Sequence, residues 1–223
     1  MKINTVISGD GSSSRYVPEM DEYYHSSHGA ITESRHIFIN AGLKQVHKDH
    51  VDIFEVGFGT GLNALLSFQY ALEHGISINY QGIEKYPLPP GITDLLNYAE
   101  MLDFSGARIG FKKLHRSEWD REHRLHPLFH FTKIHADALE HIYPRNRADL
   151  IYFDAFAPDK QSEMWTREIF QKMFLLLRQG GSLLTYSAKG QLKRDLRTCG
   201  FRVESLAGPP GKREISRAVK DPG

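Results

Sequence analysis

The chain has 223 residues, of which 40% are hydrophobic and 25% are charged, and its formal net charge is +1. This composition predicts one main globular domain and excludes a disordered or strongly basic chain. A lone cysteine, Cys199, excludes an internal disulfide and suits a reducing cytoplasm. No apolar run reaches 18 residues and no signal-peptide core is present, so we expect a cytoplasmic protein without a membrane span.

The first fifty residues predict an extension ahead of the main fold. Residues 2–17 place apolar side chains on both sides of a Gly-Asp-Gly-Ser turn, which predicts a β-hairpin. The aromatic run Tyr23-Tyr24-His25 fits either a pocket wall or the cover of a sheet edge, and residues 30–43 have helical spacing. We therefore divide the chain into this extension, residues 1–50, and a main domain, residues 51–223.

From residue 51 onward, short apolar strands alternate with helical patterns. Strands are predicted at 51–56, 76–83, 128–134, 148–153, 182–186, 201–206 and 213–219. Helices are predicted at 62–73, 92–102, 167–177 and 191–199, and the charged stretch 104–126 is interpreted as an inserted helix or loop. The alternation predicts an α/β fold: a mainly parallel seven-stranded sheet with helices on both faces and one antiparallel strand near the C-terminus.

A glycine-rich turn follows the first of these strands. Gly57, Gly59 and Gly61 alternate after the acid Glu55, and a helical pattern begins at once. A strand, a tight turn and a helix N-terminus are typical of a nucleotide-cofactor site. The alternative is a turn that needs glycine only for its backbone conformation. No Lys-Ser/Thr pair follows the loop, so a triphosphate-binding P-loop is excluded.

Three further acids stand where later strands end. Glu84 lies 23 residues beyond Gly61, where an acid accepts hydrogen bonds from ribose hydroxyls. Asp137 is placed to accept from an adenine amino group or to cap a short helix, and Asp154 follows the fourth strand. Ligands bind at the carboxyl ends of parallel strands. An NAD site would also fit the turn, but several acids suit a sulfonium and an α-amino group better than a pyrophosphate.

Several segments together resemble one family. These are G-F-G-T-G-L-N at 57–63, F-A-P with M-W-T after Asp154, G-K-R-E at 211–214, and E-S-R-H-I-F at 33–38. The combination resembles the methyltransferase half of the MnmC family, the bifunctional tRNA 5-methylaminomethyl-2-thiouridine biosynthesis proteins. Two departures are visible: the flavin-dependent oxidase half has no counterpart here, and Ala155 replaces a commoner glycine.

The resemblance implies a Rossmann-like class I methyltransferase. Its reaction would be methyl transfer from S-adenosyl-L-methionine to the exocyclic amine of 5-aminomethyl-2-thiouridine at the tRNA wobble position. We expect cofactor contacts from the turn, the strand ends and the helix start, namely Glu55, Gly57, Phe58, Gly59, Thr60, Gly61, Asn63, Glu84, Asp137 and Asp154. Asp154 can also accept a proton from the amine and orient its lone pair, which makes it the predicted catalytic residue.

Substrate contacts are expected from the later half of the chain. Phe156 could stack on a flipped-out base. Residues 189–220 hold nine basic and three acidic residues, which indicates a basic face, and Lys189, Lys212 and Arg213 are candidates for tRNA phosphate contacts. A plain solvated surface is the alternative. A separate FAD-dependent oxidase that supplies the amine is a second candidate partner.

Two other functions are alternatives to this interpretation. The chain could be a methyl- or aminopropyltransferase acting on a small free amine, or a non-catalytic module that binds tRNA or S-adenosyl-L-methionine. His123, His126 and His130 lie close in sequence but lack an accompanying cysteine or carboxylate set, so no metal site is predicted.

Overall fold

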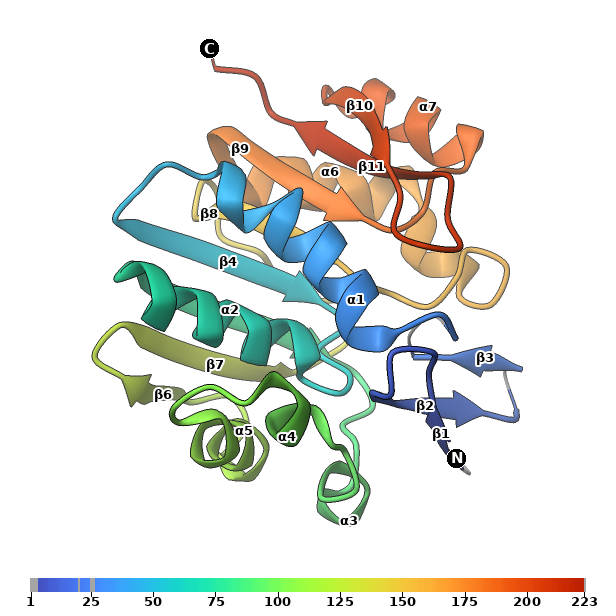
Figure 1. The fold of residues 1–223 in the computed structure, drawn as a ribbon. Helices are drawn as coiled ribbons and strands as arrows, with labels where there is room; N and C mark the ends of the chain where they lie inside the picture. The colour runs from blue at the N-terminus through green and yellow to red at the C-terminus, as the bar shows by residue number, and fades with distance from the viewer. Residues whose placement is uncertain (1–3, 20, 25–26, 223) are drawn as a thin grey trace.

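An eight-stranded sheet forms the centre of the structure, a computed structural model that describes residues 4–19, 21–24 and 27–222 (Figure 1). The strand order is β10-β11-β9-β8-β4-β5-β7-β6. The strands are β4 (His50–Val56), β5 (Ser77–Glu84), β6 (Glu122–His126), β7 (Phe129–His135), β8 (Ala148–Phe153), β9 (Leu177–Thr185), β10 (Arg202–Ala207) and β11 (Glu214–Val219). The neighbours from β9 through β8, β4 and β5 to β7 are parallel, and β11 is antiparallel to β9 and β10.

The predicted fold class is confirmed, with one strand more than the seven expected. The additional strand, β6, pairs antiparallel with β7 at the edge of the sheet. It lies in the stretch 104–126, which also contains the helix α5 (Ala107–Arg116). The sequence of β6, E-H-R-L-H, has one strongly apolar residue, because charged side chains on an edge strand protect it from pairing with other chains.

The extension at the N-terminus is a small antiparallel sheet. Its strands are β1 (Asn4–Ile7), β2 (Ser13–Val17) and β3 (Glu22–Tyr23), in the order β1-β2-β3. The predicted hairpin at 2–17 corresponds to β1 and β2, and its residues 2 and 3 lie outside the described part of the chain. The third strand was not predicted, and His25 of the aromatic run is also outside the described residues.

The helices agree with the predictions except at two places. α2 (Leu62–His74), α6 (Arg167–Leu176) and α7 (Gly190–Thr198) lie where the spacing predicts them. The helix expected at 30–43 begins as α1 (Ala30–Ser34), continues as π-helical turns (Arg35–Asn40) and is followed by a 3₁₀ turn (Leu43–Gln45). The helix expected at 92–102 is divided into α3 (Pro90–Thr93) and α4 (Tyr98–Leu102). The break falls at Asn97, whose side chain bonds to the backbone of Gly11 and Ser13 in the N-terminal sheet.

Apolar side chains cover both faces of the sheet. Ile53 and Phe54 are neighbours on β4 and, because side chains alternate along a strand, they belong to different apolar layers. One layer packs against α1, α2 and α5, through residues such as Ile31, Leu65 and Phe111. The other packs against α6 and α7, through residues such as Phe170 and Leu196. No helix in the described ranges is long and apolar enough to cross a membrane.

The functional edge of this sheet follows from its topology. Figure 1 shows the arrowheads of β4 and β7 pointing toward the side of the molecule where β1, β2 and β3 lie. The turns that follow β4, β5, β7 and β8 therefore meet at one edge, next to the N-terminal sheet. This is the edge at which open α/β sheets bind their ligands.

Candidate active site

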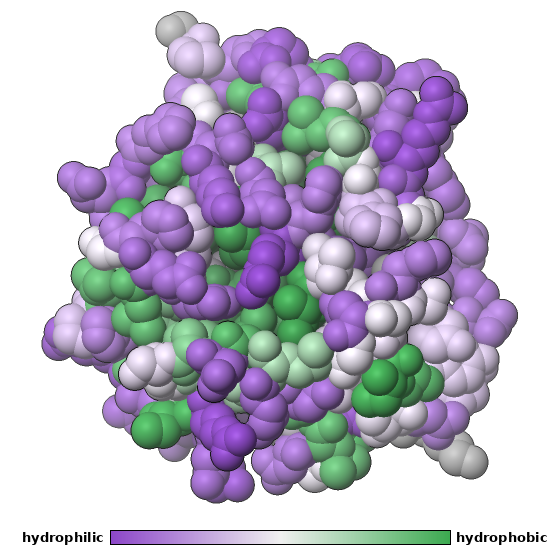
Figure 2. Space-filling model, viewed as in Figure 1, coloured by the Kyte–Doolittle hydropathy of each residue, from purple (hydrophilic) through white to green (hydrophobic). Residues whose placement is uncertain are grey.

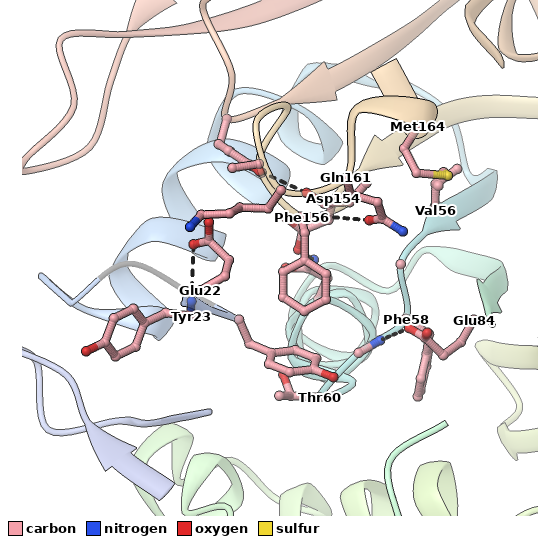
Figure 3. A pocket seen from close by; sticks show the side chains of 18 of the residues that line it. Glu22, Tyr23, Val56, Phe58, Thr60, Glu84, Asp154, Phe156, Gln161 and Met164 are labelled. Carbon is pink, nitrogen blue, oxygen red and sulfur yellow. Dashed lines mark hydrogen bonds between the residues drawn. The ribbon is translucent and has the colours of Figure 1, made fainter. Parts of the chain in front are cut away.

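A pocket of about 490 Å³ lies at this edge. Its wall includes the glycine turn, the ends of β5 and β8, and parts of the N-terminal segment and the β10–β11 turn. Most of the predicted cofactor contacts line it, namely Gly57, Phe58, Gly59, Thr60, Asn63, Glu84, Asp137 and Asp154. Figure 3 shows Phe58, Thr60, Glu84 and Asp154 around one space, although they come from distant parts of the sequence.

The glycine turn is held in a conformation that only glycine adopts easily. Gly57, Gly59 and Gly61 have φ angles of +88°, +48° and +70°. A Cβ atom on Gly57 would stand 2.6 Å from the carbonyl oxygen of Asp154, so the turn can approach β8 closely only without a side chain there. The backbone N–H groups of Gly57 and Phe58 donate to the Ile83 carbonyl at 3.0 and 3.1 Å, which ties the turn to β5.

The carboxylates of Glu84 and Asp137 line the pocket, and hydrogen bonds from backbone N–H groups hold them in place. Glu84 accepts from the N–H of Gly59 at 3.0 Å and from that of Tyr86 at 2.9 Å. Asp137 accepts from the N–H of Leu139 at 2.9 Å, so it also caps the following turn. Lys85 lies 2.7 Å from Asp137 and, by hydrogen bonding, holds the pKa of that carboxyl below its usual value.

A single amide links two carboxyl groups under the turn. The Nδ2 group of Asn63 donates to Glu55 and to Asp154, both at 2.8 Å. Glu55 is 1% exposed and does not line the pocket, in contrast to the other predicted acids. Burial, followed by the nearby charge of Asp154, raises the pKa of Glu55 well above its ordinary value. Glu55 is therefore placed to support Asn63 rather than to touch a ligand directly.

Asp154 carries an unusual proton affinity. Burial raises the pKa of its carboxyl to about 7, the charge of Glu33 adds to this effect, and the Asn63 hydrogen bond and the Lys212 charge oppose it. Lys212 lies 2.5 Å from Glu33 and places its ammonium group 4.1 Å from the centre of the Tyr186 ring. A carboxyl group that titrates near neutrality inside a pocket is suited to accepting and releasing protons.

Aromatic side chains form another part of the wall. Phe156 points into the pocket in Figure 3, and its ring meets that of Tyr24 edge to face at a centroid distance of 5.0 Å. The Phe156 backbone is fixed by Trp165, whose Nε1–H donates to the Phe156 carbonyl at 2.8 Å. Tyr186 donates its hydroxyl hydrogen to the carbonyl of Ala155 at 2.9 Å. The strand β8 is thus followed by a rigid segment that carries both Asp154 and Phe156.

The sequence did not identify every residue of the pocket wall. Glu33, Lys160, Gln161 and Tyr186 also line the pocket and were not predicted as site residues. The available signals were weak: Glu33 belongs to the segment 33–38 that resembles the family, and Tyr24 lies in the aromatic run interpreted as either pocket or sheet cover. Lys160, Gln161 and Tyr186 had no signal of their own.

The three predicted tRNA contacts are not brought together. Lys212 lines the pocket, whereas Lys189 and Arg213 do not. Lys189 is paired with Asp159 at 3.0 Å, and Arg213 is exposed on the turn between β10 and β11. Elsewhere in residues 189–220, Lys193 pairs with Glu214 at 2.8 Å and Arg217 with Glu204 at 2.6 Å. Much of the expected basic face is therefore neutralised within the protein.

A second group of buried polar residues supports the glycine turn from behind. The ring of His115 donates from Nε2 to the Thr60 carbonyl at 3.1 Å, because a carbonyl can only accept. Burial lowers the pKa of His115 to about 4, so the ring is neutral at physiological pH. Lys133, which is 1% exposed, donates to the His115 carbonyl at 2.8 Å. Among residues 4–19, 21–24 and 27–222, no three His, Cys, Asp or Glu side chains are grouped so that they could hold a metal ion.

The comparisons with known proteins agree with this geometry. Residues 111–221 match a family model described as S-adenosyl-L-methionine-dependent methyltransferase. The chain is 31% identical over 219 residues to the tRNA 5-methylaminomethyl-2-thiouridine biosynthesis bifunctional protein MnmC of Cupriavidus necator, covering 91% of this chain and 32% of the relative. It is 32% identical over 222 residues to the MnmC protein of Pseudoalteromonas atlantica, covering 89% of this chain and 31% of that protein. The chain thus spans about a third of the length of these relatives.

Solved structures show the same fold. A crystal structure described as MnmC2 from Aquifex aeolicus matches with a TM-score of 0.78 at 22% identity, covering 100% of this chain and 71% of the other. Spermidine synthase from Thermotoga maritima matches with a TM-score of 0.54 at 15% identity, covering 100% and 73%. The family model, which matches just under half of the chain, and the curated relatives, which are similar over nearly all of it, both agree with an S-adenosyl-L-methionine-dependent methyltransferase that uses S-adenosyl-L-methionine as its cofactor.

Proposed function

We propose that this chain transfers the methyl group of S-adenosyl-L-methionine to the exocyclic amine of 5-aminomethyl-2-thiouridine at the tRNA wobble position. The MnmC proteins are named for the biosynthesis of 5-methylaminomethyl-2-thiouridine, the methylated form of this nucleoside, and the similarity to them supports the substrate. The observation that carries the chemistry is Asp154, a carboxyl group with a pKa of about 7 on the wall of the pocket. The product would be 5-methylaminomethyl-2-thiouridine.

The wall residues fit the proposed cofactor. Glu84 lies at the end of β5, the strand next to β4, where a carboxylate can accept from ribose hydroxyls. Asp137 lies at the end of the next strand and suits the adenine amino group. Asn63 has a buried Oδ1 atom with no hydrogen-bond partner in the described chain, which leaves an acceptor for a bound ligand. When bound, the cofactor supplies a methyl group whose bond to a positively charged sulfur breaks as the amine nitrogen attacks.

Asp154 would prepare the amine for this attack. A primary amine on a methylene carbon is protonated at neutral pH, so it must give up a proton before its nitrogen has a free lone pair. The ionised carboxylate of Asp154 can take that proton and hold the nitrogen in place. A carboxyl with the ordinary pKa of 3.8 would be a much weaker base than one with a pKa of about 7. Holding the two reactants in line can lower the reaction barrier by about 7–11 kcal/mol at most. We therefore expect the orientation of the amine to contribute more to the rate than the basicity of Asp154.

The aromatic wall and the charged rim would hold the nucleotide. Tyr24 and Phe156 offer ring faces to a base that has left its stack, and stacking on an aromatic ring is worth about 1–3 kcal/mol. Arg213, which is exposed outside the pocket, would contact a phosphate, and Lys189 would contact one in place of its ion pair with Asp159. Lys212 stands beside Glu33 inside the pocket, so we assign it to the charge balance of Asp154.

Two finer points belong to the same proposal. The amine substrate has to be produced before it can be methylated, and an FAD-dependent oxidase is the partner that the resemblance implies for that step. The proposed location is the cytoplasm, where a tRNA substrate and a reduced Cys199 are both expected.

The decisive experiment supplies labelled cofactor and undermodified tRNA that carries 5-aminomethyl-2-thiouridine, followed by digestion to nucleosides. We expect a labelled methylaminomethyl nucleoside, and we expect no labelled product from free spermidine. Asp154→Asn should slow turnover by about 10²-fold or more while cofactor binding changes little. The matched control is Asp221→Asn, the same chemical change at an exposed ion pair with Arg202. Methylation of the polyamine instead of the tRNA would replace this proposal by a small-amine transferase, and no transfer to either would leave a binding module.

A further inference from the structure

One face of α5 carries only positive charge. Arg108, Lys112 and Arg116 are exposed and follow one another at intervals of four residues, so they form a line along the helix surface. We call these three residues the α5 stripe. The opposite side of α5, with Phe111 and Leu114, is buried against the core.

The stripe is not neutralised by the protein. The helix contains no acidic residue between Ala107 and Arg116. Arg108 has a long contact of 3.6 Å with the exposed Glu100. For Lys112 and Arg116, the described part of the chain offers no ion-pair partner. In residues 189–220, by contrast, Lys193 and Arg217 are paired with acids of neighbouring strands, although the exposed Arg194 and Arg197 of α7 have no ion-pair partner in the described chain.

Helix stability does not explain this arrangement. Like charges four residues apart repel one another, so the pairs 108/112 and 112/116 weaken the helix. Arg108 stands in the first turn, where the helix dipole disfavours a cation, and no acid occupies that turn. Only Arg116, in the last turn, is favoured by the dipole. The charges of the α5 stripe destabilise the helix and gain no close ion pair within the described chain. This indicates that they act on a partner outside the chain.

The stripe lies beside the proposed active site. His115 directly precedes Arg116 and donates to the Thr60 carbonyl, so the C-terminal end of α5 is attached to the glycine turn that walls the pocket. In Figure 1 α5 lies next to α4 below α2, and in the same view Figure 2 shows strongly hydrophilic side chains at the lower edge of the surface. The end of the stripe at Arg116 is therefore close enough to the pocket wall to meet a large substrate that extends beyond the pocket.

We propose that the α5 stripe binds the phosphate backbone of the substrate tRNA, an inference that rests on the proposed function. Arg108 and Arg116 are eight helical steps apart, about 12 Å along the axis, which exceeds the spacing of neighbouring phosphates on one strand, about 3.4 Å along the axis in B-DNA. The stripe can therefore meet three consecutive or alternate phosphates. Such contacts supply affinity and orientation without reading bases.

The test compares two double variants that remove the same charge. Lys112→Gln with Arg116→Gln changes the stripe, and Arg194→Gln with Arg197→Gln changes exposed arginines of α7 at the other end of the sheet. Glutamine keeps a high helix propensity, so both proteins should fold, and their thermal unfolding is measured first. The readouts are tRNA binding at several salt concentrations, KM and kcat for tRNA, and the Kd of the cofactor.

For the stripe variant we expect tRNA affinity at 0.15 M salt to fall by roughly 15- to 30-fold and the salt slope to decrease by about 1.4–1.8. KM for tRNA should rise while kcat and cofactor binding stay the same, which a damaged glycine turn would not allow. The α7 variant should bind like the unmodified protein. Equal binding by both variants, or equal losses in both, would overturn the assignment. A protein that binds tRNA through the stripe but methylates nothing would refute the proposed function alone.

Discussion

Asp154 offers a substitution that should remove activity and increase stability at the same time. Burial raises the pKa of its carboxyl from 3.8 to about 7, so ionising this group costs more in the folded than in the unfolded protein. A group whose pKa is raised by folding stabilises the fold only while it is protonated, and the folded state loses this advantage as the pH rises. Asp154→Asn removes the ionisation and keeps an oxygen that can accept from Asn63.

The expected gain follows from the two pKa values. The pKa of Asp154 is 3.8 in the unfolded protein and about 7 in the folded protein. Ionisation of this carboxyl therefore lowers the free energy of unfolding of the unmodified protein by about 0.5 kcal/mol at pH 4, about 3 kcal/mol at pH 6 and about 4 kcal/mol at pH 8. Asp154→Asn should regain these amounts. Water that reaches the carboxyl from the pocket reduces all three in proportion, so they are upper values and their rise with pH is the sharper prediction.

The assay is chemical denaturation of both proteins at pH 4, 6 and 8, with the free energy of unfolding extrapolated to zero denaturant. The control is Asp221→Asn, because Asp221 is about half exposed and its replacement should give no gain that grows with pH. A constant difference at the three pH values, or a variant less stable than the unmodified protein at pH 8, would refute the buried-carboxyl argument. If Asp154→Asn abolishes methyl transfer and its gain in stability grows with pH, then Asp154 serves the reaction although its ionised form destabilises the fold.

Two further predictions concern the surroundings of this carboxyl. Removing a positive neighbour raises the pKa of Asp154, and removing a negative neighbour lowers it. Lys212→Met should therefore move the midpoint of the pH dependence of kcat/KM upward, and Glu33→Gln should move it downward. Midpoints that move in the same direction would contradict the assigned charges. Gly57→Ala should destabilise the protein by about 2 kcal/mol or more and abolish cofactor binding, because φ is +88° and the new Cβ would stand 2.6 Å from a carbonyl oxygen. Gly75→Ala, at φ +69° with nothing within 4 Å, is the control and should cost about 1 kcal/mol with activity retained, as measured by thermal unfolding and cofactor titration.

The parts of the fold that were predictable depend on local patterns. Apolar runs followed by a glycine turn or an acid located β4, β5, β7 and β8, and the rule that ligands bind at the carboxyl ends of parallel strands brought their acids to one edge. The strand β6 was missed because an edge strand does not need the apolar alternation by which buried strands are found. The break at Asn97 was missed because it depends on hydrogen bonds to residues 84 and 86 positions away in the chain.

The same distinction applies to the candidate site. Gly57, Glu84 and Asp154 end or follow strands, so their positions in the chain already specify their positions in space. Glu33 and Tyr186 reach the pocket through the packing of α1 and the segment after β9, which no spacing rule describes. Glu55 shows the limit within the motif itself, since this residue near the end of β4 accepts a hydrogen bond from Asn63, eight residues later, and does not line the pocket.

The number of basic residues in a segment does not by itself give the charge of the surface that the segment forms. Residues 189–220 hold nine basic and three acidic residues, which suggests a nucleic-acid face, yet Lys212 pairs with Glu33 and Lys189 with Asp159 from outside that segment. A cation paired with a nearby carboxylate gives little attraction to a distant phosphate, because the two fields largely cancel beyond a Debye length of about 8 Å. In α5 no acid stands within the helix to cancel the field. The charges available to an RNA are therefore set by which acids the fold brings close, and the ion pairs of Lys189 and Lys212 make the C-terminal segment less attractive to an RNA than its count of basic residues suggests.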